Sequence, residues 1–262
     1  MVDPLHPLSV LFLGTSSCTP EKGGNTASML VDRRVVIDAG WYLTDRILAA
    51  DVDPLAVEAV LFSHCHHDHI LGLPQLLFYY GIRRAARPAR PLHVYGPAGE
   101  IGRVVADGQR YLQLDRYPEL DFDLEVHDVA PGDAFAAGDL RVTTCASRHN
   151  VPGLCYRIAN AHGATAAFSG DTRFNPDLAE LARGAGLLVH EASRGGSSSR
   201  GNDAAAHSGA PDAAEIARQA GVRRLALVHC GPAAREQALA AAKVVFANSF
   251  FPREGEEVLV EA

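Results

Sequence analysis

Short runs of apolar and β-branched residues alternate with helical patterns along the whole chain. The runs predict strands at Val10–Leu13, Ser28–Val31, Val35–Ile37, Ala59–Phe62, Leu92–Tyr95, Leu124–Val129, Leu140–Cys145, Cys155–Ile158, Thr165–Phe168, Leu187–Val189, Leu225–Val228 and Glu257–Val260. The stretches between them predict helices at Tyr42–Ala50, Leu73–Arg84, Gly99–Arg110, Asp177–Arg183, Pro211–Ala220 and Ala233–Ala242. Strands and helices alternate with no linker between them, which favours one α/β domain over residues 1–262 with two packed sheets.

One stretch departs from this alternation. Gly195–Gly201 reads Gly-Gly-Ser-Ser-Ser-Arg-Gly, a composition typical of a flexible connection. We therefore predict a mobile surface loop there. The longer segment Ser193–His207 has two interpretations at this point: a loop that folds over a substrate, or a loose insertion.

Composition narrows the class of protein. The formal net charge of the 262 residues is −7, from 24 Lys plus Arg against 31 Asp plus Glu, so the chain lacks the basic field of a dedicated nucleic-acid binder. Its apolar runs are far shorter than the ~18 residues of a membrane span, and the first residues lack the pattern of a secretory signal. The five Cys are scattered without a Cys-x-x-Cys pair, which favours a reducing, cytoplasmic location.

The unusual count is that of histidine, at 12 residues. Five potential metal ligands crowd into Ser63–His69, which reads Ser-His-Cys-His-His-Asp-His directly after a predicted strand. In an extended segment His64 and His66 point the same way, whereas Asp68 and His69 would project from the first turn of a following helix. One strand-to-helix turn could thus serve two adjacent metal positions. Imidazole and carboxylate ligands favour zinc, with manganese, iron or cobalt as alternatives; the competing interpretation is a His-rich surface loop that binds metal adventitiously.

Three more candidate ligands follow predicted strands. His149, Asp171 and His229 each lie just beyond the carboxyl end of an apolar strand, where α/β sheets deliver their site residues. A single histidine in such a place is more often structural than a ligand. The joint placement of the three residues makes a shared metal site the better interpretation.

These motifs together resemble the metallo-β-lactamase fold. The pattern His-x-His-x-Asp-His, then a later His, then Gly-Asp-Thr, then a strand ending in His, is most similar to the ribonuclease Z-like phosphodiesterase branch. The resemblance runs from about residue 9 to residue 231, and further matching stretches are Phe12–Ser16, Asn25–Ser28, Val36–Gly40, Phe168–Thr172, Leu188–Ala192 and His207–Ser208.

The resemblance implies a four-layer αββα sandwich, two mixed β-sheets flanked by helices, and a centre of two divalent metal ions. The ions would be Zn²⁺, with Mn²⁺ or Fe²⁺ as alternatives. One ion would be held by His64, His66 and His149, the other by Asp68, His69 and His229, with Asp171 bridging the two. Two such cations lower the pKa of water towards neutrality and so provide hydroxide at neutral pH.

The resemblance also assigns roles beyond metal binding. Asp68 would orient or deprotonate the nucleophile in addition to ligating. Glu191 would support His207, which would act as general acid on the leaving group. The alternatives are an exposed strand-end charge for Glu191 and a helix-capping residue for His207.

The substrate class rests on two departures from the tRNA-processing enzymes. Only residues 150–170 separate His149 from Asp171, which leaves no room for the long arm by which those enzymes grip tRNA. The stretch His229–Pro232, His-Cys-Gly-Pro, also lacks their Ser-x-Arg-Tyr motif. A basic run at Arg83, Arg84, Arg87 and Arg90 is a counter-signal for RNA, although such runs are more often solvated helix ends.

We therefore expect a metal-dependent hydrolase of a small or cyclic phosphodiester. We expect no membrane partner. The resemblance is compatible with a homodimer. One alternative is a tRNA 3′-processing endonuclease of the ribonuclease Z type. Another is a thioester, lactone or sulfate-ester hydrolase of the same fold, which the stretch His149–Gly153, His-Asn-Val-Pro-Gly, faintly favours. The Glu191–His207 pair argues against that last alternative, because a thiolate leaves without an acid.

Overall fold

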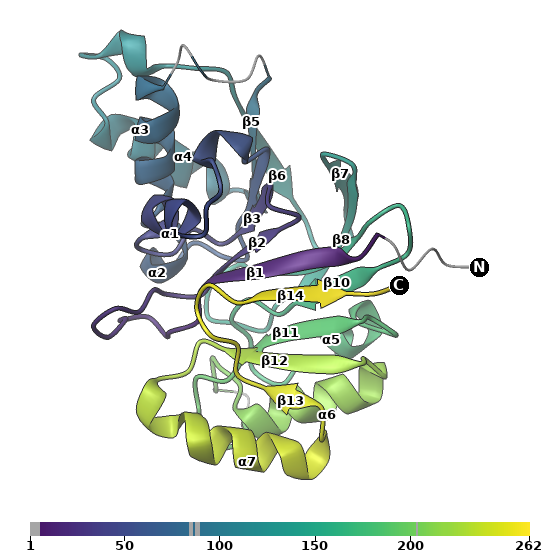
Figure 1. Cartoon of the computed structure of the whole chain (residues 1–262). Helices are drawn as coiled ribbons and strands as arrows, with labels where there is room; N and C mark the ends of the chain where they lie inside the picture. Colours follow the sequence, from purple (N-terminus) through teal and green to yellow (C-terminus); the bar gives the residue numbers. More distant parts are fainter. Residues whose placement is uncertain (1–5, 84–85, 87–89, 203) are drawn as a thin grey trace.

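Two β-sheets packed face to face form the centre of the molecule, and helices cover their outer faces (Figure 1). The computed structural model describes residues 6–83, 86, 90–202 and 204–262. Each sheet has seven strands. This is the four-layer αββα arrangement that the sequence predicted, and that prediction is confirmed. Within the described ranges, no helix is long and apolar enough to cross a membrane.

The first sheet has the strand order β14-β1-β2-β3-β4-β5-β6. Its members are β1 (Leu8–Gly14), β2 (Ser28–Val31), β3 (Val35–Ile37), β4 (Ala59–Leu61), β5 (Leu92–Pro97), β6 (Leu124–Val129) and β14 (Glu257–Val260). Pairing is antiparallel from β14 to β3 and parallel from β3 to β6. Strand β6 is therefore an edge strand.

The second sheet has the order β13-β12-β11-β10-β9-β8-β7. It consists of β7 (Ala134–Ala137), β8 (Leu140–Ala146), β9 (Leu154–Ala159), β10 (Thr165–Phe168), β11 (Leu187–Glu191), β12 (Arg224–Val228) and β13 (Ser249–Phe250). Pairing is antiparallel from β7 to β10 and parallel from β10 to β13. Because parallel strands end at the same edge of a sheet, the loops after β10, β11 and β12 meet there.

The helices fall into two groups, one on each outer face (Figure 1). The first sheet carries α1 (Leu43–Ala49), α3 (Leu73–Ile82) and α4 (Ile101–Tyr111), with the short α2 (His67–Ile70) at its edge; the second carries α5 (Pro176–Leu181), α6 (Ala210–Ala220) and α7 (Arg235–Val245). Three 3₁₀ turns are described, at Pro54–Ala56, Pro118–Leu120 and Pro232–Ala234.

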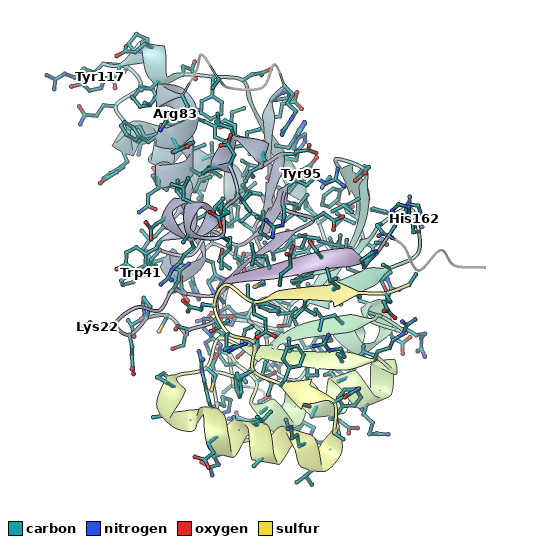
Figure 2. The ribbon with its side chains drawn as sticks, viewed as in Figure 1. Lys22, Trp41, Arg83, Tyr95, Tyr117 and His162 are labelled. Carbon is teal, nitrogen blue, oxygen red and sulfur yellow. The ribbon has the colours of Figure 1, made fainter. Side chains whose placement is uncertain are left out.

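A third apolar cluster lies between the sheets, and each strand contributes alternate residues to it. On β1, Val10 and Phe12 face this inner core while Leu11 and Leu13 face the helices. Tyr95 of β5, labelled in Figure 2, belongs to the inner core. Both faces of the central strands are thus buried, which explains why the sequence shows continuous apolar runs there.

The stretch Gly195–Gly201 differs from its prediction as a mobile surface loop. The Ser199 side chain is buried and its hydroxyl accepts a hydrogen bond from the Phe174 amide at 2.9 Å. The Ser199 amide donates to Asp212 at 2.6 Å, and Ser198 also bonds to that carboxylate. The serines of this segment therefore hold it against the start of α6 through hydrogen bonds to Asp212.

Candidate metal centre

Three imidazoles meet where β4 and β8 end. His64 lies three residues beyond β4, His66 directly precedes α2, and His149 lies three residues beyond β8. The His66 Nδ1 atom lies 3.1 Å from His64 Nε2 and 3.2 Å from His149 Nε2. The three nitrogens therefore surround one point, as the sequence predicted for the first metal position.

A second group adjoins the first. Asp68 and His69 lie in α2, and His229 follows β12 directly with a left-handed backbone, φ 55°. The Asp68 Oδ2 atom lies 3.0 Å from His229 Nε2 and 3.3 Å from His69 Nε2. Asp171, from the loop after β10, lies between the groups: its Oδ2 is 3.8 Å from His64 Nε2 and 3.6 Å from both His69 Nε2 and His229 Nε2.

Asp38 sets the orientation of two of these rings. Its Oδ2 accepts a hydrogen bond from His69 Nδ1 at 2.8 Å and another from the Ser63 hydroxyl at 2.7 Å. Since the Ser63 hydroxyl donates to Asp38, its oxygen accepts from His64 Nδ1 at 3.1 Å. Both rings thus carry a proton on Nδ1 and turn Nε2 towards the centre.

His149 and His229 are oriented in the same way by other partners. His149 Nδ1 donates to the Ala206 carbonyl at 2.7 Å. His229 Nδ1 lies 2.7 Å from Ser193 Oγ, whose hydroxyl donates to Glu191 Oε2 at 2.6 Å. Four of the five inward-facing imidazoles therefore turn Nε2 lone pairs towards one another and towards carboxylate oxygens.

This arrangement of nitrogen and oxygen atoms fits positive charge at the centre. A neutral His229 Nε2 and the Asp68 oxygen, 3.0 Å apart, are two acceptors that repel unless a proton or a metal lies between them. The His69 Nε2 atom is buried and has no hydrogen-bond partner. Divalent metals with a preference for nitrogen and oxygen ligands fit such a donor set.

Buried negative charge leads to the same conclusion. Asp38, Asp68, Asp171 and Glu191 are exposed by only 2%, 7%, 3% and 1%, and buried carboxylates are costly without cations nearby. Burial alone would raise the pKa of Asp171, but positive charge on His229 and His69 outweighs it and holds that pKa well below its usual range. Burial and the neighbouring His69 keep the pKa of His64 well below its ordinary value, so this ring is neutral and free to ligate.

Glu191 and His207 form a pair beside the two groups. Glu191 ends β11, and its Oε1 accepts from the Thr172 amide at 2.8 Å and from His207 Nδ1 at 3.1 Å. His207 Nδ1 also lies 3.6 Å from Asp171 Oδ2. Burial alone would lower the pKa of His207, but the hydrogen bond and charge of Glu191, with the charges of Asp171 and Asp68, outweigh it and raise that pKa.

The segment from Ser193 to His207 borders this site directly. Ser193 orients His229, the Ala206 carbonyl orients His149, and His207 bonds to Glu191. Asp38 and Ser193 have these roles without having been singled out from the sequence. The one available signal for Asp38 was its position at the end of a buried strand, within Val36–Gly40.

Other candidates lie outside the site. The Cys65 thiol, whose pKa burial raises to about 12, lines a separate hollow of about 440 Å³ with Arg103 and Tyr111. Arg83 lies over the Tyr79 ring, and Arg90 donates to the carbonyls of Ala56 and Val57. Of the same basic run, Arg84 and Arg87 fall outside the described residues.

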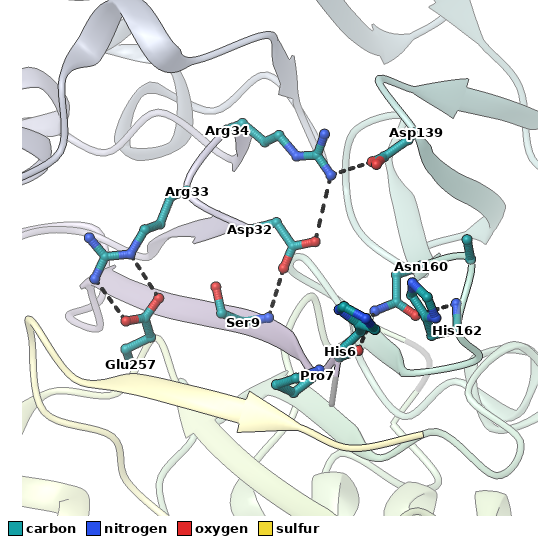
Figure 3. A pocket seen from close by; sticks show the side chains of 11 residues that line it. His6, Pro7, Ser9, Asp32, Arg33, Arg34, Asp139, Asn160, His162 and Glu257 are labelled. Atoms are coloured by element: carbon teal, nitrogen blue, oxygen red, sulfur yellow. Dashed lines mark hydrogen bonds and ion pairs between the residues drawn. The ribbon is translucent and has the colours of Figure 1, made fainter. Parts of the chain in front are cut away.

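A hollow of about 510 Å³ near the start of the chain is unsuited to binding a metal ion (Figure 3). Its charged groups already pair with one another: Arg33 with Glu257, and Arg34 with Asp32 and Asp139. No donors converge on a shared point there among the residues drawn, in contrast to the centre around Asp171.

We expect Asp38→Asn to weaken metal binding by about 10- to 100-fold, because the carboxylate holds His69 directly and His64 through Ser63. Competition with a chromophoric chelator measures this affinity. Asp139→Asn is a matched control, since the Asp139 side chain is 70% exposed on another surface. Equal affinities for the Asp38 variant and the control would contradict the orienting role.

Sequence relatives are consistent with the site. Residues 33–230 match the family model described as Beta-lactamase superfamily domain. The chain is 30% identical to Ribonuclease Z of Methanothermobacter thermautotrophicus over 91% of this chain and 92% of that protein. It is also 34% identical to an uncharacterized protein of Mycobacterium tuberculosis, over 81% of this chain and 76% of that one.

Solved structures share the fold. The metallo-beta-lactamase fold protein YhfI from Bacillus subtilis superposes with a TM-score of 0.80 at 21% identity, covering 97% of this chain and 100% of that chain. Human tRNase Z, short form, superposes with a TM-score of 0.77 at 20% identity, covering 95% and 98%. With the family match over most of its length, this chain belongs to the metallo-β-lactamase superfamily and is a ribonuclease Z-like hydrolase.

Proposed function

We propose that the protein is a dinuclear metal-dependent phosphodiesterase that acts on small or cyclic phosphodiesters. His64, His66 and His149 would hold one ion, Asp68, His69 and His229 would hold the other, and Asp171 would bridge them. The ions are Zn²⁺, with Mn²⁺ or Fe²⁺ as alternatives. When bound, they supply Lewis acidity, lower the pKa of water and neutralise charge on a phosphoryl group.

The observation that carries the proposal is the position of His207. The raised pKa of His207 favours the protonated imidazole, and Glu191 holds the ring through Nδ1 at 3.1 Å. His207 Nε2 is thus left to give a proton to a leaving oxygen. An alkoxide leaves a phosphodiester poorly unless it is protonated, so this residue matches phosphodiester cleavage better than thioester cleavage.

Asp68 has the second protein role. Its Oδ2 lies beside both His69 and His229, and the nearby imidazoles keep the pKa of Asp68 far below its usual range despite burial, so the group is ionised. An ionised carboxylate at this point accepts a hydrogen bond from an attacking water and orients it. Asp68 thus both ligates and positions the nucleophile in this proposal.

The short connection between His149 and Asp171 supports a small substrate. Residues 150–170 contain β9 and β10 with the turn that joins them. The name of the Methanothermobacter relative, Ribonuclease Z, favours a second candidate function, tRNA 3′-end processing.

Location and oligomeric state remain predictions. The five cysteines are free thiols, which is consistent with the predicted cytoplasmic location. The predicted homodimer has no test in the structure of a single chain.

We expect chelation to abolish hydrolysis of bis-para-nitrophenyl phosphate, and Zn²⁺ or Mn²⁺ to restore it, because the protein groups alone lack the charge needed to activate water. Activity assays before and after dialysis against a chelator measure this. Full activity after the metal has been removed would contradict the proposal, as would turnover of lactones or thioesters without turnover of phosphodiesters.

A substrate panel separates the two candidate functions. Cyclic nucleotides, cyclic phosphates and a precursor tRNA are compared at equal enzyme concentration. The proposal predicts the highest kcat/KM for a small or cyclic phosphodiester. Efficient cleavage of the precursor tRNA at its 3′ end, with weak turnover of the small substrates, would favour the endonuclease instead.

A further inference from the structure

A second cluster of metal-binding side chains lies on the first sheet, in strands that contribute none of the residues described above. In the parallel pair of β5 and β6, His93 is opposite Glu125, and Tyr95 is opposite His127. Side chains two residues apart in a strand share a face. His93, Glu125 and His127 therefore point to the same side, the inter-sheet side to which Tyr95 belongs.

The donor atoms of the cluster form a small triangle. His93 Nδ1 lies 3.1 Å from His127 Nε2 and 3.4 Å from Glu125 Oε2, and His127 Nε2 lies 3.7 Å from the same oxygen. A tetrahedral zinc ion with ligands at about 2.0–2.1 Å separates its ligand atoms by about 3.4 Å. The three distances bracket that value.

Neighbouring rings hold the imidazoles in place. The His127 ring stacks on Tyr95 with centroids 4.4 Å apart and planes at 15°, and Tyr95 stacks in turn on Phe135 of β7 at 4.5 Å. The stack thus fixes His127 Nε2 beside His93 Nδ1 and Glu125 Oε2 before a metal binds.

The cluster is also open to solvent on one side. The side chains of His93, Glu125 and His127 are 31%, 51% and 35% exposed. Two histidines and one carboxylate leave the fourth position of a tetrahedral ion to water. A metal can therefore enter from solvent at the edge of the sandwich, because β6 is the edge strand of its sheet.

We propose that His93, Glu125 and His127 form a separate Zn²⁺ site. A zinc ion bound there would cross-link the edge strand β6 to β5. The site is independent of the proposed phosphodiesterase centre, since the two share no residue. Binding joins strands that are about thirty residues apart along the chain, and so stabilises the pairing that closes this end of the first sheet. Other late first-row divalent ions, above all Cu²⁺, fit the same donor set.

The test compares zinc content between matched variants of the full chain. Protein is equilibrated with buffered Zn²⁺, and bound zinc per chain is measured by native mass spectrometry. His127→Phe removes the ligating nitrogen while keeping a ring on Tyr95, and Glu125→Gln removes the carboxylate charge at constant shape. His162→Gln, an exposed histidine on another surface, is the control.

We expect His127→Phe to bind one zinc fewer per chain than the wild type, Glu125→Gln to bind that zinc at least tenfold more weakly, and His162→Gln to match the wild type. Equal zinc content in the wild type and His127→Phe would overturn the proposal. The readout is a difference between variants, so it holds whatever the occupancy or activity of the centre around Asp171.

Thermal unfolding gives a second readout. Added Zn²⁺ should raise the Tm of the wild type and of His162→Gln more than that of Glu125→Gln, because a ligand stabilises only the state that binds it. If added Zn²⁺ raised the Tm of Glu125→Gln and of the wild type equally, the three side chains would be linked by hydrogen bonds and would not bind zinc. That result would likewise overturn the proposal.

Discussion

Asp171→Ala should lose bound metal and reduce phosphodiester hydrolysis by on the order of a thousandfold or more. Its carboxylate lies within 3.6–3.8 Å of the Nε2 atoms of three histidines that belong to the two ligand groups. Removing it deletes the one group shared by both ions and a full negative charge in a buried site. The two cations would then repel each other with less negative charge between them to offset the repulsion.

Two measurements check this result. Metal content is determined by elemental analysis, and kcat/KM by hydrolysis of bis-para-nitrophenyl phosphate. Asp177→Ala is a matched control, because Asp177 is near in sequence but its side chain is 62% exposed. An Asp171→Ala protein that is folded by circular dichroism and carries as much metal as Asp177→Ala would contradict the bridging role.

His207→Ala should slow a substrate with a poor leaving group by about 10²–10⁴-fold and an activated aryl ester far less. The reason is that para-nitrophenolate leaves without protonation, whereas an alkoxide needs the proton that His207 supplies. The comparison requires kcat for an alkyl and an aryl phosphodiester in both proteins. An equal loss with both substrates would remove the general-acid assignment.

The same role predicts a pH dependence. Glu191 and the nearby carboxylates raise the pKa of His207, so the acid form is present below that raised pKa and is lost as the pH rises through it. With the alkyl substrate, the wild-type rate should therefore fall on the alkaline side. His207→Ala should lack this alkaline fall, and His162→Ala should retain it.

Much of the fold was predictable because its local patterns agree with its tertiary structure. The strands Ser28–Val31 and Leu124–Val129 have the bounds that their apolar and β-branched residues predicted. Strand β7, Ala134–Ala137, was not predicted, because its Ala-rich sequence has little strand propensity and only its pairing with β8 makes it a strand. Strand β13 has two residues, too few for any pattern.

The inner part of the candidate site was also predictable, since its residues follow strands whose carboxyl ends meet at one edge. The outer part was not, because it depends on three-dimensional pairing. Asp38 reaches Ser63 through the parallel pairing of β3 with β4. Ser193 reaches His229 from the end of a different strand.

The pair formed by His93 and His127 illustrates the same limit. The two residues are far apart in the sequence and come together only through the register of β5 against β6. Neither lies in a ligand motif, so no spacing rule singles them out. Their donor geometry emerges from strand pairing and from the aromatic stack on Tyr95.

Seven side chains from separate stretches are proposed to hold two metal ions. X-ray diffraction from crystals grown with Zn²⁺, with data on both sides of the zinc absorption edge, tests this proposal most directly. We expect two anomalous peaks with Asp171 between them, one by His64, His66 and His149 and the other by Asp68, His69 and His229. A single peak, or none, around Asp171 at full zinc saturation would show that these side chains do not hold two ions, whatever is bound at His93 and His127.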